Sequence, residues 1–233
     1  MEQVTFKKTV SPKGTVGPYC KLTVADVYEG KTEFKCAVVF DPAEEGVNDY
    51  IKDIEAAADA GYAKGIAEID KDLETAKGAK LNSLKERRDN LIRSCPVKDE
   101  VAEDGSPTGR YLVNFKRTAK GVYRFGKDQG KSWSIKLPIF DTKKKPITES
   151  EGEIYEGSTL RIQALLKTYT MPTRAGVSMN IRAVQVINLI SRADGGGDAS
   201  GFDIEEGYEA SEVERVVSKG EPSESYQDDS SDF

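Results

Sequence analysis

Residues 158–169 alternate between aliphatic side chains and longer polar or aromatic ones. One parity holds Leu160, Ile162, Ala164 and Leu166. The other holds Arg161, Gln163, Leu165, Lys167 and Tyr169. A period of two places these sets on opposite faces of a β-strand. The segment therefore predicts a strand whose aliphatic face is buried and whose Arg, Lys and Tyr side chains point outward.

Similar patterns predict strands over 15–28, 32–40, 110–117, 122–125, 132–140 and 177–190. The first two are expected to form a hairpin, because Gly30 lies in the turn between them. In the second, Phe34, Cys36, Val38 and Phe40 share the buried parity. Trp133 shares its parity with the apolar residues of 132–140, which predicts a core position.

A helical stretch is expected from Asp41-Pro42 to about Arg93, with Asp41 as N-cap and Pro42 at the first helical position. Its apolar residues recur every three to four positions. Gly61, Gly65 and Gly78 argue against one unbroken helix. We favour a helix packed on a sheet, or a helical hairpin, over an arm for partner contact. Residues 96–109 are expected to form a polar loop.

Many short strands with one helical insertion, at about 43–95, predict a mainly β protein. The expected fold is an OB-fold, a five-stranded Greek-key barrel. It would span 1–193. Residues 194–233 contain the Gly195-Gly196-Gly197 hinge and are rich in Asp, Glu, Ser and Gly, so we expect a flexible, disordered acidic tail.

Charge is distributed very unevenly along the 233 residues. The chain has a net charge of -6. Residues 110–193 carry 16 basic and 6 acidic residues, a net charge of +10, whereas 194–233 carry 2 and 13, a net charge of -11. A basic segment beside an acidic tail indicates nucleic-acid binding. The alternative is a solvated, lysine-rich surface.

Several functional classes are excluded by composition. The chain has no histidine, which rules out Ser-His-Asp and Cys-His nucleophile pairs and any His-containing metal site. Its three cysteines show no CxxC spacing, so a zinc finger is excluded and reduced thiols are expected. With no long apolar run and no signal-peptide pattern, we expect a soluble intracellular protein.

Motifs for catalysis or cofactor binding are also missing. The sequence contains no P-loop, no GxGxxG after a strand and no GxSxG. Glu149, Glu151, Glu153 and Glu156 could serve a metal-dependent nuclease, but they lie in a polar loop and are expected to face solvent. We therefore expect no enzymatic activity, no cofactor and no metal.

The chain ends on an aromatic residue, Phe233, which follows the acidic residues Asp228, Asp229 and Asp232. Chance placement is one explanation. The other is an anchor, in which the ring and terminal carboxylate fill a partner's pocket and the acidic residues meet its basic rim.

Taken in order, several motifs resemble the single-stranded DNA-binding proteins of short-tailed, T7-type bacteriophages. They are Gly17-Pro18-Tyr19, Val38-Val39-Phe40-Asp41-Pro42, Gly157–Ile162 running on through Tyr169 to the strand Val177–Leu189, the Gly195-Gly196-Gly197-Asp198 hinge, Glu205-Glu206-Gly207-Tyr208, and the terminal Asp232-Phe233. The order of parts matches over nearly the whole chain, and the match is thin over 45–130.

This resemblance implies an OB-fold protein that coats single-stranded DNA in phage replication, recombination and repair, in the cytoplasm of the infected host. It further implies a homodimer, strand annealing, and a tail that contacts DNA polymerase and helicase/primase and competes with DNA. Tyr169 matches the family's base-stacking tyrosine, Lys116 a groove lysine and Phe233 the anchor. Met171 stands where the family often has a tryptophan.

We therefore expect single-stranded DNA to contact an outward basic and aromatic face. Its expected members are Tyr169, Arg161, Lys167, Lys116, Arg174, Arg182, Lys21, Lys35 and Tyr111. The partner-binding residues are expected to be Phe233, Asp232, Asp229 and Asp228. The competing class is a non-enzymatic phage interaction or assembly protein without a DNA role.

Overall fold

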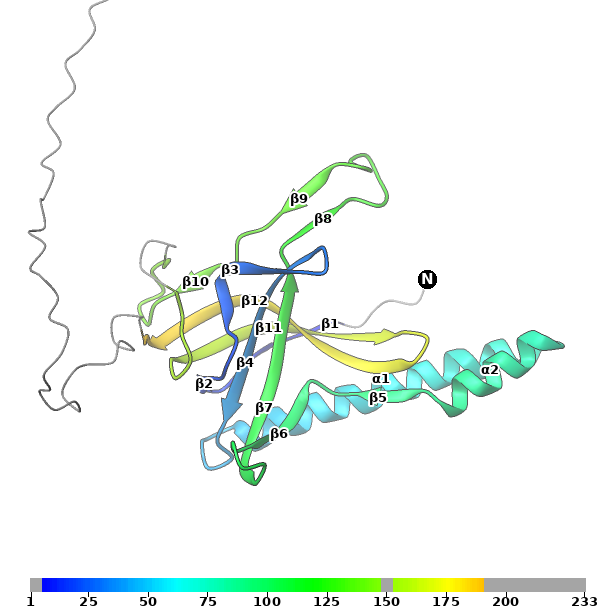
Figure 1. The fold of residues 1–233 in the computed structure, drawn as a ribbon, viewed down its shortest axis with the longest axis horizontal. Coiled ribbons are helices and arrows are strands. Elements are labelled where there is room, and N and C mark those ends of the chain that lie inside the picture. Colours follow the sequence, from blue (N-terminus) through cyan, green and yellow to red (C-terminus); the bar gives the residue numbers. More distant parts are fainter. Residues whose placement is uncertain (1–5, 148–152, 191–233) are drawn as a thin grey trace, which may run out of the picture. The chain divides into compact units, whose positions relative to one another are not determined.

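A closed five-stranded barrel forms the centre of the computed structural model, which describes residues 6–147 and 153–190. Its strands are β2 (Gly14–Val16), β4 (Lys31–Phe40), β7 (Pro107–Thr118), β12 (Arg174–Asn188) and β11 (Thr159–Thr170). They pair in that order, and β11 pairs back to both β12 and β2. Only the β7–β12 pair in this ring is parallel. The expected mainly β, OB-type barrel is confirmed (Figure 1).

Further strands extend the barrel sheet at its edges. They are β1 (Phe6–Val10) on β11, β3 (Lys21–Tyr28) on β4, β5 (Ile92–Ser94) and β10 (Ile139–Phe140) on β12, and β6 (Val97–Val101) on β7. The β3–β4 hairpin turns at Gly30, whose φ of 73° is the left-handed conformation that glycine readily adopts. The predicted hairpin is confirmed, but the single strand expected over 15–28 is wrong: it is divided into β2 and β3 by a turn in which Tyr19 has a positive φ of 64°.

The barrel interior is filled by the residues that the alternation had placed there. Phe34, Cys36, Val38 and Phe40 of β4 are buried, as are Leu160, Ile162, Ala164 and Leu166 of β11. Removing these aliphatic and aromatic surfaces from water is the main force that closes the barrel. The intervening residues, among them Lys35 and Lys116, are consequently left on the outer face.

The helical insertion forms two helices, α1 (Val47–Thr75) and α2 (Ala79–Asp89). The predicted start at Pro42 is wrong: the Asp41 carboxylate instead accepts the Ala43 N–H (2.8 Å) in a turn, and α1 begins after Gly46. Gly78 interrupts the helix, as its φ of 58° requires. Gly61 and Gly65 do not interrupt it, because both lie on its buried face.

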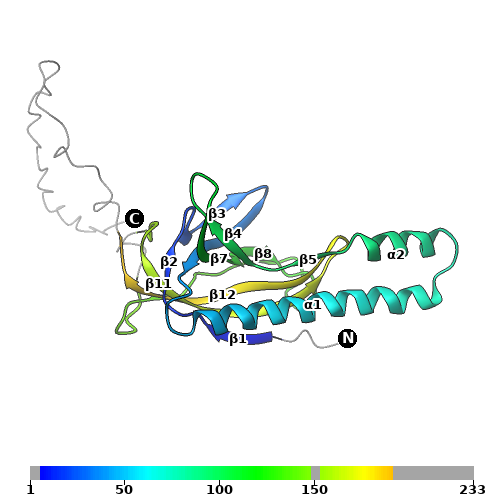
Figure 2. The same ribbon diagram turned by 90° about the horizontal axis from the view of Figure 1, so that it is seen from below.

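Helix α1 packs along the ribbon formed by β11 and β12 (Figure 2). Exposed ion pairs add to this packing, since Arg93 of β5 contacts Asp59 (2.5 Å) and Arg88 of α2 contacts Asp70 (2.5 Å). The favoured interpretation, a helix on a sheet continued as a helical hairpin, matches this arrangement.

Three further local predictions fail. The expected loop at 96–109 contains β6 and the start of β7, which form a hairpin whose turn is closed by the Ala102 N–H and the Ser106 carbonyl. The expected strands at 122–125 and 132–140 shorten to β8 (Lys120–Val122), β9 (Ser132–Ser134) and β10. Trp133 is half-buried on the separate β8–β9 sheet rather than in the core. Because β9 ends at Ser134, the alternation that buries Leu137 and Ile139 does not extend back to Trp133.

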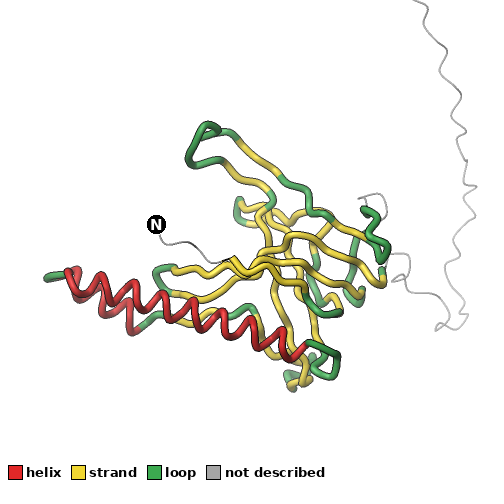
Figure 3. Tube along the Cα trace, turned by 180° about the vertical axis from the view of Figure 1, so that it is seen from behind, coloured by secondary structure: helices red, strands yellow, loops and turns green. Residues whose placement is uncertain are grey.

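The β8–β9 hairpin stands away from the barrel, on a different side from the helices (Figure 3). Across residues 6–147 and 153–190, neither helix is long and apolar enough to cross a bilayer. The expected acidic tail at 194–233 lies outside the described residues.

Candidate nucleic-acid interface

A groove of about 660 Å³ runs over the outer face of the barrel, where β4 and β7 meet β5 and β12. It is lined by Pro18, Tyr19, Glu33, Lys35, Cys36, Ala37, Ser94, Cys95, Pro96, Leu112, Asn114, Phe115, Lys116, Tyr169, Arg174, Val177, Ser178 and Met179. We call it the basic groove. Four of the nine DNA-contact residues expected from sequence lie together in it, namely Lys35, Lys116, Tyr169 and Arg174.

Strand register aligns three lysines across neighbouring strands. Lys21 of β3 lies opposite Lys35 of β4, and Lys35 lies opposite Lys116 of β7. Side chains directly opposite one another share a face of the sheet, and adjacent strands are only about 4.8 Å apart. Like charges at such positions destabilise a sheet. A row of three lysines is therefore an arrangement that a bound polyanion would relieve.

A fourth lysine, Lys167 of β11, lies beside the groove without lining it. Lys167 lies opposite Ser178, a groove residue, and the Ser178 hydroxyl donates to the Lys167 carbonyl (3.3 Å). Lys167 therefore flanks the groove on the side opposite Lys21. The cations span the width of the barrel face.

Two acidic residues partly offset the positive charge of these lysines. Asp26 of β3 pairs with Lys35, and the hydrogen bond from the Lys35 ammonium lowers the pKa of the Asp26 carboxyl. Glu33 lies two residues before Lys35 on β4, and it lines the groove itself. Lys35 is thus held by a carboxylate that an incoming phosphate would have to displace.

Tyr169 is fixed in place by a cross-strand hydrogen bond. Its hydroxyl donates to Ser94 Oγ (2.7 Å). In register, Gly176 of β12 lies between Tyr169 of β11 and Ser94 of β5, so the ring crosses β12 where no side chain stands. A Cβ at position 176 would lie 1.9 Å from the Ser94 carbonyl oxygen, which only glycine avoids. The half-buried ring therefore forms a firm wall of the groove.

Tyr19 is a groove residue that the sequence analysis did not single out as a contact. It is 87% exposed and has a positive φ of 64°, which directs the ring outward from the turn before β3. The signal was the Gly17-Pro18-Tyr19 turn, where a large ring follows a glycine and a proline, two residues typical of turns. Ser94 and Asn114, which add polar groups to the groove, carried no such signal.

Of the five expected residues that do not line the groove, Lys21 and Lys167 flank it and the other three lie elsewhere. Arg161 lines a different pocket, beside Glu45, Asp49 and Asp53 at the start of α1. Arg182 is exposed on β12, and its carbonyl accepts a hydrogen bond from Arg117 (3.3 Å). Tyr111 is half-buried and packs against the barrel core.

The three cysteines form no disulfide. Cys20, Cys36 and Cys95 are free thiols. Contact with Cys20 and burial both raise the pKa of Cys36, so it stays protonated. Within the described ranges, no three cysteine or acidic side chains are grouped to hold a metal ion.

The expected partner-binding residues Phe233, Asp232, Asp229 and Asp228 lie outside the described residues. Their expected role stays a prediction.

Comparison with known structures shows a shared fold. The chain superimposes on gp2.5, a single-stranded DNA-binding protein encoded by bacteriophage T7, with a TM-score of 0.62 and 21% identity, covering 89% of this chain and 100% of that one. A single-stranded DNA-binding protein from bacteriophage Enc34, solved in complex with ssDNA, gives a TM-score of 0.46 at 14% identity, over 78% of this chain and 86% of that one. No curated protein matches the sequence.

A family model described as "Single-stranded DNA-binding protein, Bacteriophage T7" matches residues 13–190. This range contains every strand of the barrel, both helices and the whole basic groove. The resemblance inferred from the motifs is confirmed, as is the expectation that the chain is not an enzyme. The chain belongs to the bacteriophage T7 family of single-stranded DNA-binding proteins.

Proposed function

We propose that this protein binds single-stranded DNA in the basic groove without reading its sequence. The observation that carries the proposal is the meeting of Lys35, Lys116 and Arg174 with the ring of Tyr169 in one groove of about 660 Å³. Membership of a family of single-stranded DNA-binding proteins supports it.

The groove offers contacts both to the backbone phosphates and to the bases of a single strand. Lysine and arginine side chains neutralise backbone phosphates, and their contribution falls as salt rises. Tyr169 and Tyr19 present ring faces on which bases of any identity can stack, each contributing about 1–3 kcal/mol. A duplex keeps its bases stacked on one another, so we expect the groove to prefer single strands.

Membership of the family supports a proposal for the biological role. We propose that the protein coats single strands during phage DNA replication, recombination and repair, and assists strand annealing, as a homodimer in the cytoplasm of the infected bacterial cell. Residues 1–193, with the helical insertion at about 43–95, would form the DNA-binding domain.

Residues 194–233 would act as a tethered competitor of DNA. Their net charge of -11 complements the groove, and a short tether gives an effective concentration in the roughly millimolar range. When DNA displaces the tail, Phe233 and the neighbouring Asp232, Asp229 and Asp228 would become available to DNA polymerase and helicase/primase.

A fluorescence-anisotropy titration tests this function. A labelled single strand and its duplex are titrated with the full chain at two salt concentrations, and the single strand also with a chain that ends at Ser211. We expect salt-sensitive binding that prefers the single strand and tightens on truncation. Unchanged affinity of the truncated chain at low salt would contradict the competing tail.

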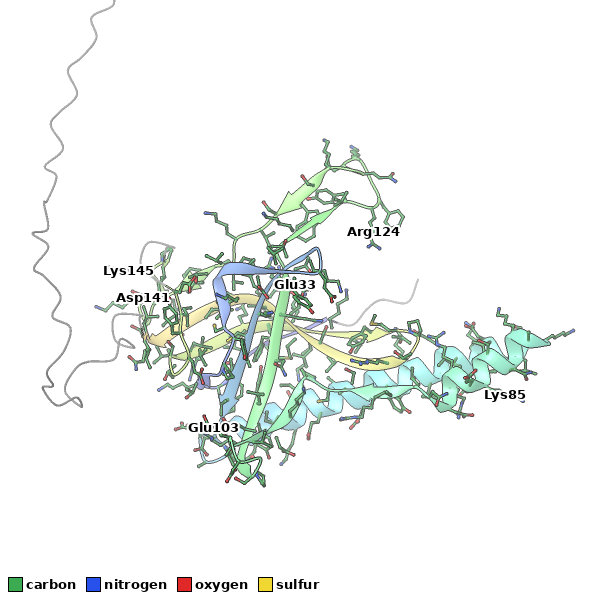
Figure 4. All side chains as sticks on the ribbon, in the orientation of Figure 1. Glu33, Lys85, Glu103, Arg124, Asp141 and Lys145 are labelled. Carbon is green, nitrogen blue, oxygen red and sulfur yellow. The ribbon has the colours of Figure 1, made fainter. Side chains whose placement is uncertain are left out.

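The groove itself is tested by a double variant, Lys35→Ala/Lys116→Ala, which should bind single strands at least about ten-fold more weakly. The matched control is Lys80→Ala/Lys85→Ala, which removes the same charge from outside the groove. Both residues belong to α2, on which Figure 4 labels Lys85. Equal losses in both variants would indicate diffuse attraction. No binding by any chain would favour an interaction or assembly protein without a DNA role.

A further inference from the structure

The β8–β9 hairpin, residues 120–134, is a basic and aromatic element outside the groove. Its loop is ordered by backbone hydrogen bonds: the Tyr123 N–H donates to the Lys131 carbonyl (3.0 Å), and the Gly130 N–H donates to the Tyr123 carbonyl (2.9 Å). Gly126 and Gly130 take up the positive φ angles of the turns. The loop residues are therefore presented in a defined conformation.

Two rings on this hairpin lie open to solvent. Phe125 is 85% exposed and Tyr123 is 45% exposed. Trp133 lies at the base, against Gly121, where a Cβ would come within 2.6 Å of the indole ring. Val122, which precedes Tyr123 and Phe125, is also exposed, so apolar side chains gather on this hairpin, and such clusters mark contact surfaces.

The charge around these rings is positive. Residues 120–134 carry four cations, at Lys120, Arg124, Lys127 and Lys131, and one acidic residue, Asp128. Lys131 pairs with Asp128 (2.9 Å). Arg124 and Lys127, on either side of Phe125, are exposed and form no ion pair with the part of the chain that the structure describes. Phe125 is therefore flanked in the sequence by two cations that no ion pair occupies.

Chain continuity joins the hairpin to the basic groove. Lys116 of the groove precedes Lys120 by four residues, and Thr118 at the end of β7 lies opposite the groove residue Glu33. The Ala119 N–H then donates to the Thr32 carbonyl (2.7 Å), which fixes the point of departure. In Figure 4, Glu33 lies where the hairpin leaves the barrel and Arg124 lies on its far part.

From these observations we propose that the β8–β9 hairpin is a second contact for single-stranded DNA, which receives the strand as it leaves the basic groove past Lys116. Phe125 stacks on a base and Arg124 and Lys127 bind the flanking phosphates. Alternating cations and rings are the chemistry of non-specific single-strand binding. The inference rests on the proposed function and lengthens the site beyond the barrel.

The consequence is a dependence on strand length. A strand of about 6 nucleotides falls within the range of one OB barrel, and one of about 30 extends past it. The hairpin should add affinity only for the longer strand. Trp133 is the single tryptophan of the chain, so its fluorescence reports on the hairpin and should be quenched by the longer strand alone.

The test titrates the full chain and its variants with oligothymidylates of these two lengths. We expect Phe125→Ala to bind the longer strand about ten-fold more weakly and the shorter strand unchanged. Arg124→Ala/Lys127→Ala should lower the slope of log affinity against log salt by about 0.7 for each phosphate lost. The matched controls are Tyr28→Ala, which removes an exposed ring at the β3–β4 turn, and Lys80→Ala/Lys85→Ala. Neither control should change how the affinity depends on strand length.

Each outcome separates this inference from the proposed function. If the unmodified chain binds both strands but the hairpin variants bind the longer one fully and Trp133 fluorescence stays constant, the hairpin contact is overturned and the groove is not. Equal weakening on both lengths would also contradict a second contact. If the unmodified chain binds neither strand, the proposed function fails first, and a protein partner becomes the better occupant of the hairpin.

Discussion

Gly61 of α1 lies directly against Gly176 of β12: a Cβ at position 61 would lie 2.4 Å from the Gly176 carbonyl oxygen. One turn further along α1, a Cβ at Gly65 would lie 2.5 Å from the Ala175 Cβ. The two glycines therefore let the helix approach the ribbon backbone to backbone. Gly176 also lies between Tyr169 and Ser94, so this contact supports one wall of the basic groove.

Replacing Gly61 with alanine should destabilise the fold. Helix propensity alone would favour alanine by about 1 kcal/mol, but the added methyl group meets backbone, and overpacking of this kind costs about 1–3 kcal/mol. We expect a lower midpoint in chemical denaturation. Ala63→Gly, at an exposed position of the same helix, measures the propensity effect by itself. A Gly61→Ala chain that is more stable than the parent would show that the contact is not tight.

Tyr50→Phe should leave the fold equally stable or stabilise it by about 1 kcal/mol. The Tyr50 ring packs near Phe40, with ring centroids 5.8 Å apart. Its hydroxyl is buried without a hydrogen-bond partner among the described residues, and burial raises its pKa. Tyr62→Phe is the control, because the Tyr62 hydroxyl donates to the Leu91 carbonyl (3.3 Å) and its loss should destabilise. Thermal melting of both variants decides the comparison.

Asp26→Asn should tighten single-strand binding by a few-fold. The substitution removes the carboxylate that holds Lys35, so a phosphate no longer competes for that ammonium. Asp72→Asn, an exposed position on α1, changes the net charge equally and is the control. Anisotropy titration at low salt compares the two. The same gain in both variants would mean that only net charge matters.

Ser94 holds the Tyr169 hydroxyl, so if Tyr169 contacts DNA as proposed, Ser94→Ala should weaken single-strand binding several-fold by freeing the ring. Tyr169→Phe removes the same hydrogen bond from the other side. A double-mutant cycle should find the two losses non-additive. Fully additive losses would contradict the positioning role. Tyr169→Ala removes the ring itself and should cost about 1–3 kcal/mol of binding free energy.

Much of the barrel could be predicted because alternation over β4 and β11 reflects burial directly. The helix was harder. Gly61 and Gly65 weaken a helix in isolation, and only the close contact with β12 explains their presence inside one. The β6 strand escaped prediction because its residues are mostly exposed and polar, so it has no apolar alternation. Trp133 was misplaced because a strand break separates it from Leu137 and Ile139.

The site could be predicted only in part, for a reason of geometry. That Lys35 and Lys116 face outward follows from parity, but their side-by-side placement depends on the β4–β7 register, which no local pattern encodes. Arg161 shares a strand with Tyr169, yet it lies beside acidic residues of α1 in another pocket. Tyr19 depends on a backbone turn rather than on a strand pattern.

The most direct test of the central claim is to map where a single strand lies. A photoreactive oligonucleotide with iodinated pyrimidines is bound to the full chain, cross-linked by light and located by peptide mass spectrometry. The account predicts cross-links at Tyr169 and Tyr19, lost when Lys35 and Lys116 are both replaced by alanine. Cross-links confined to α2 or to the Arg161 pocket, with none in the basic groove, would contradict it.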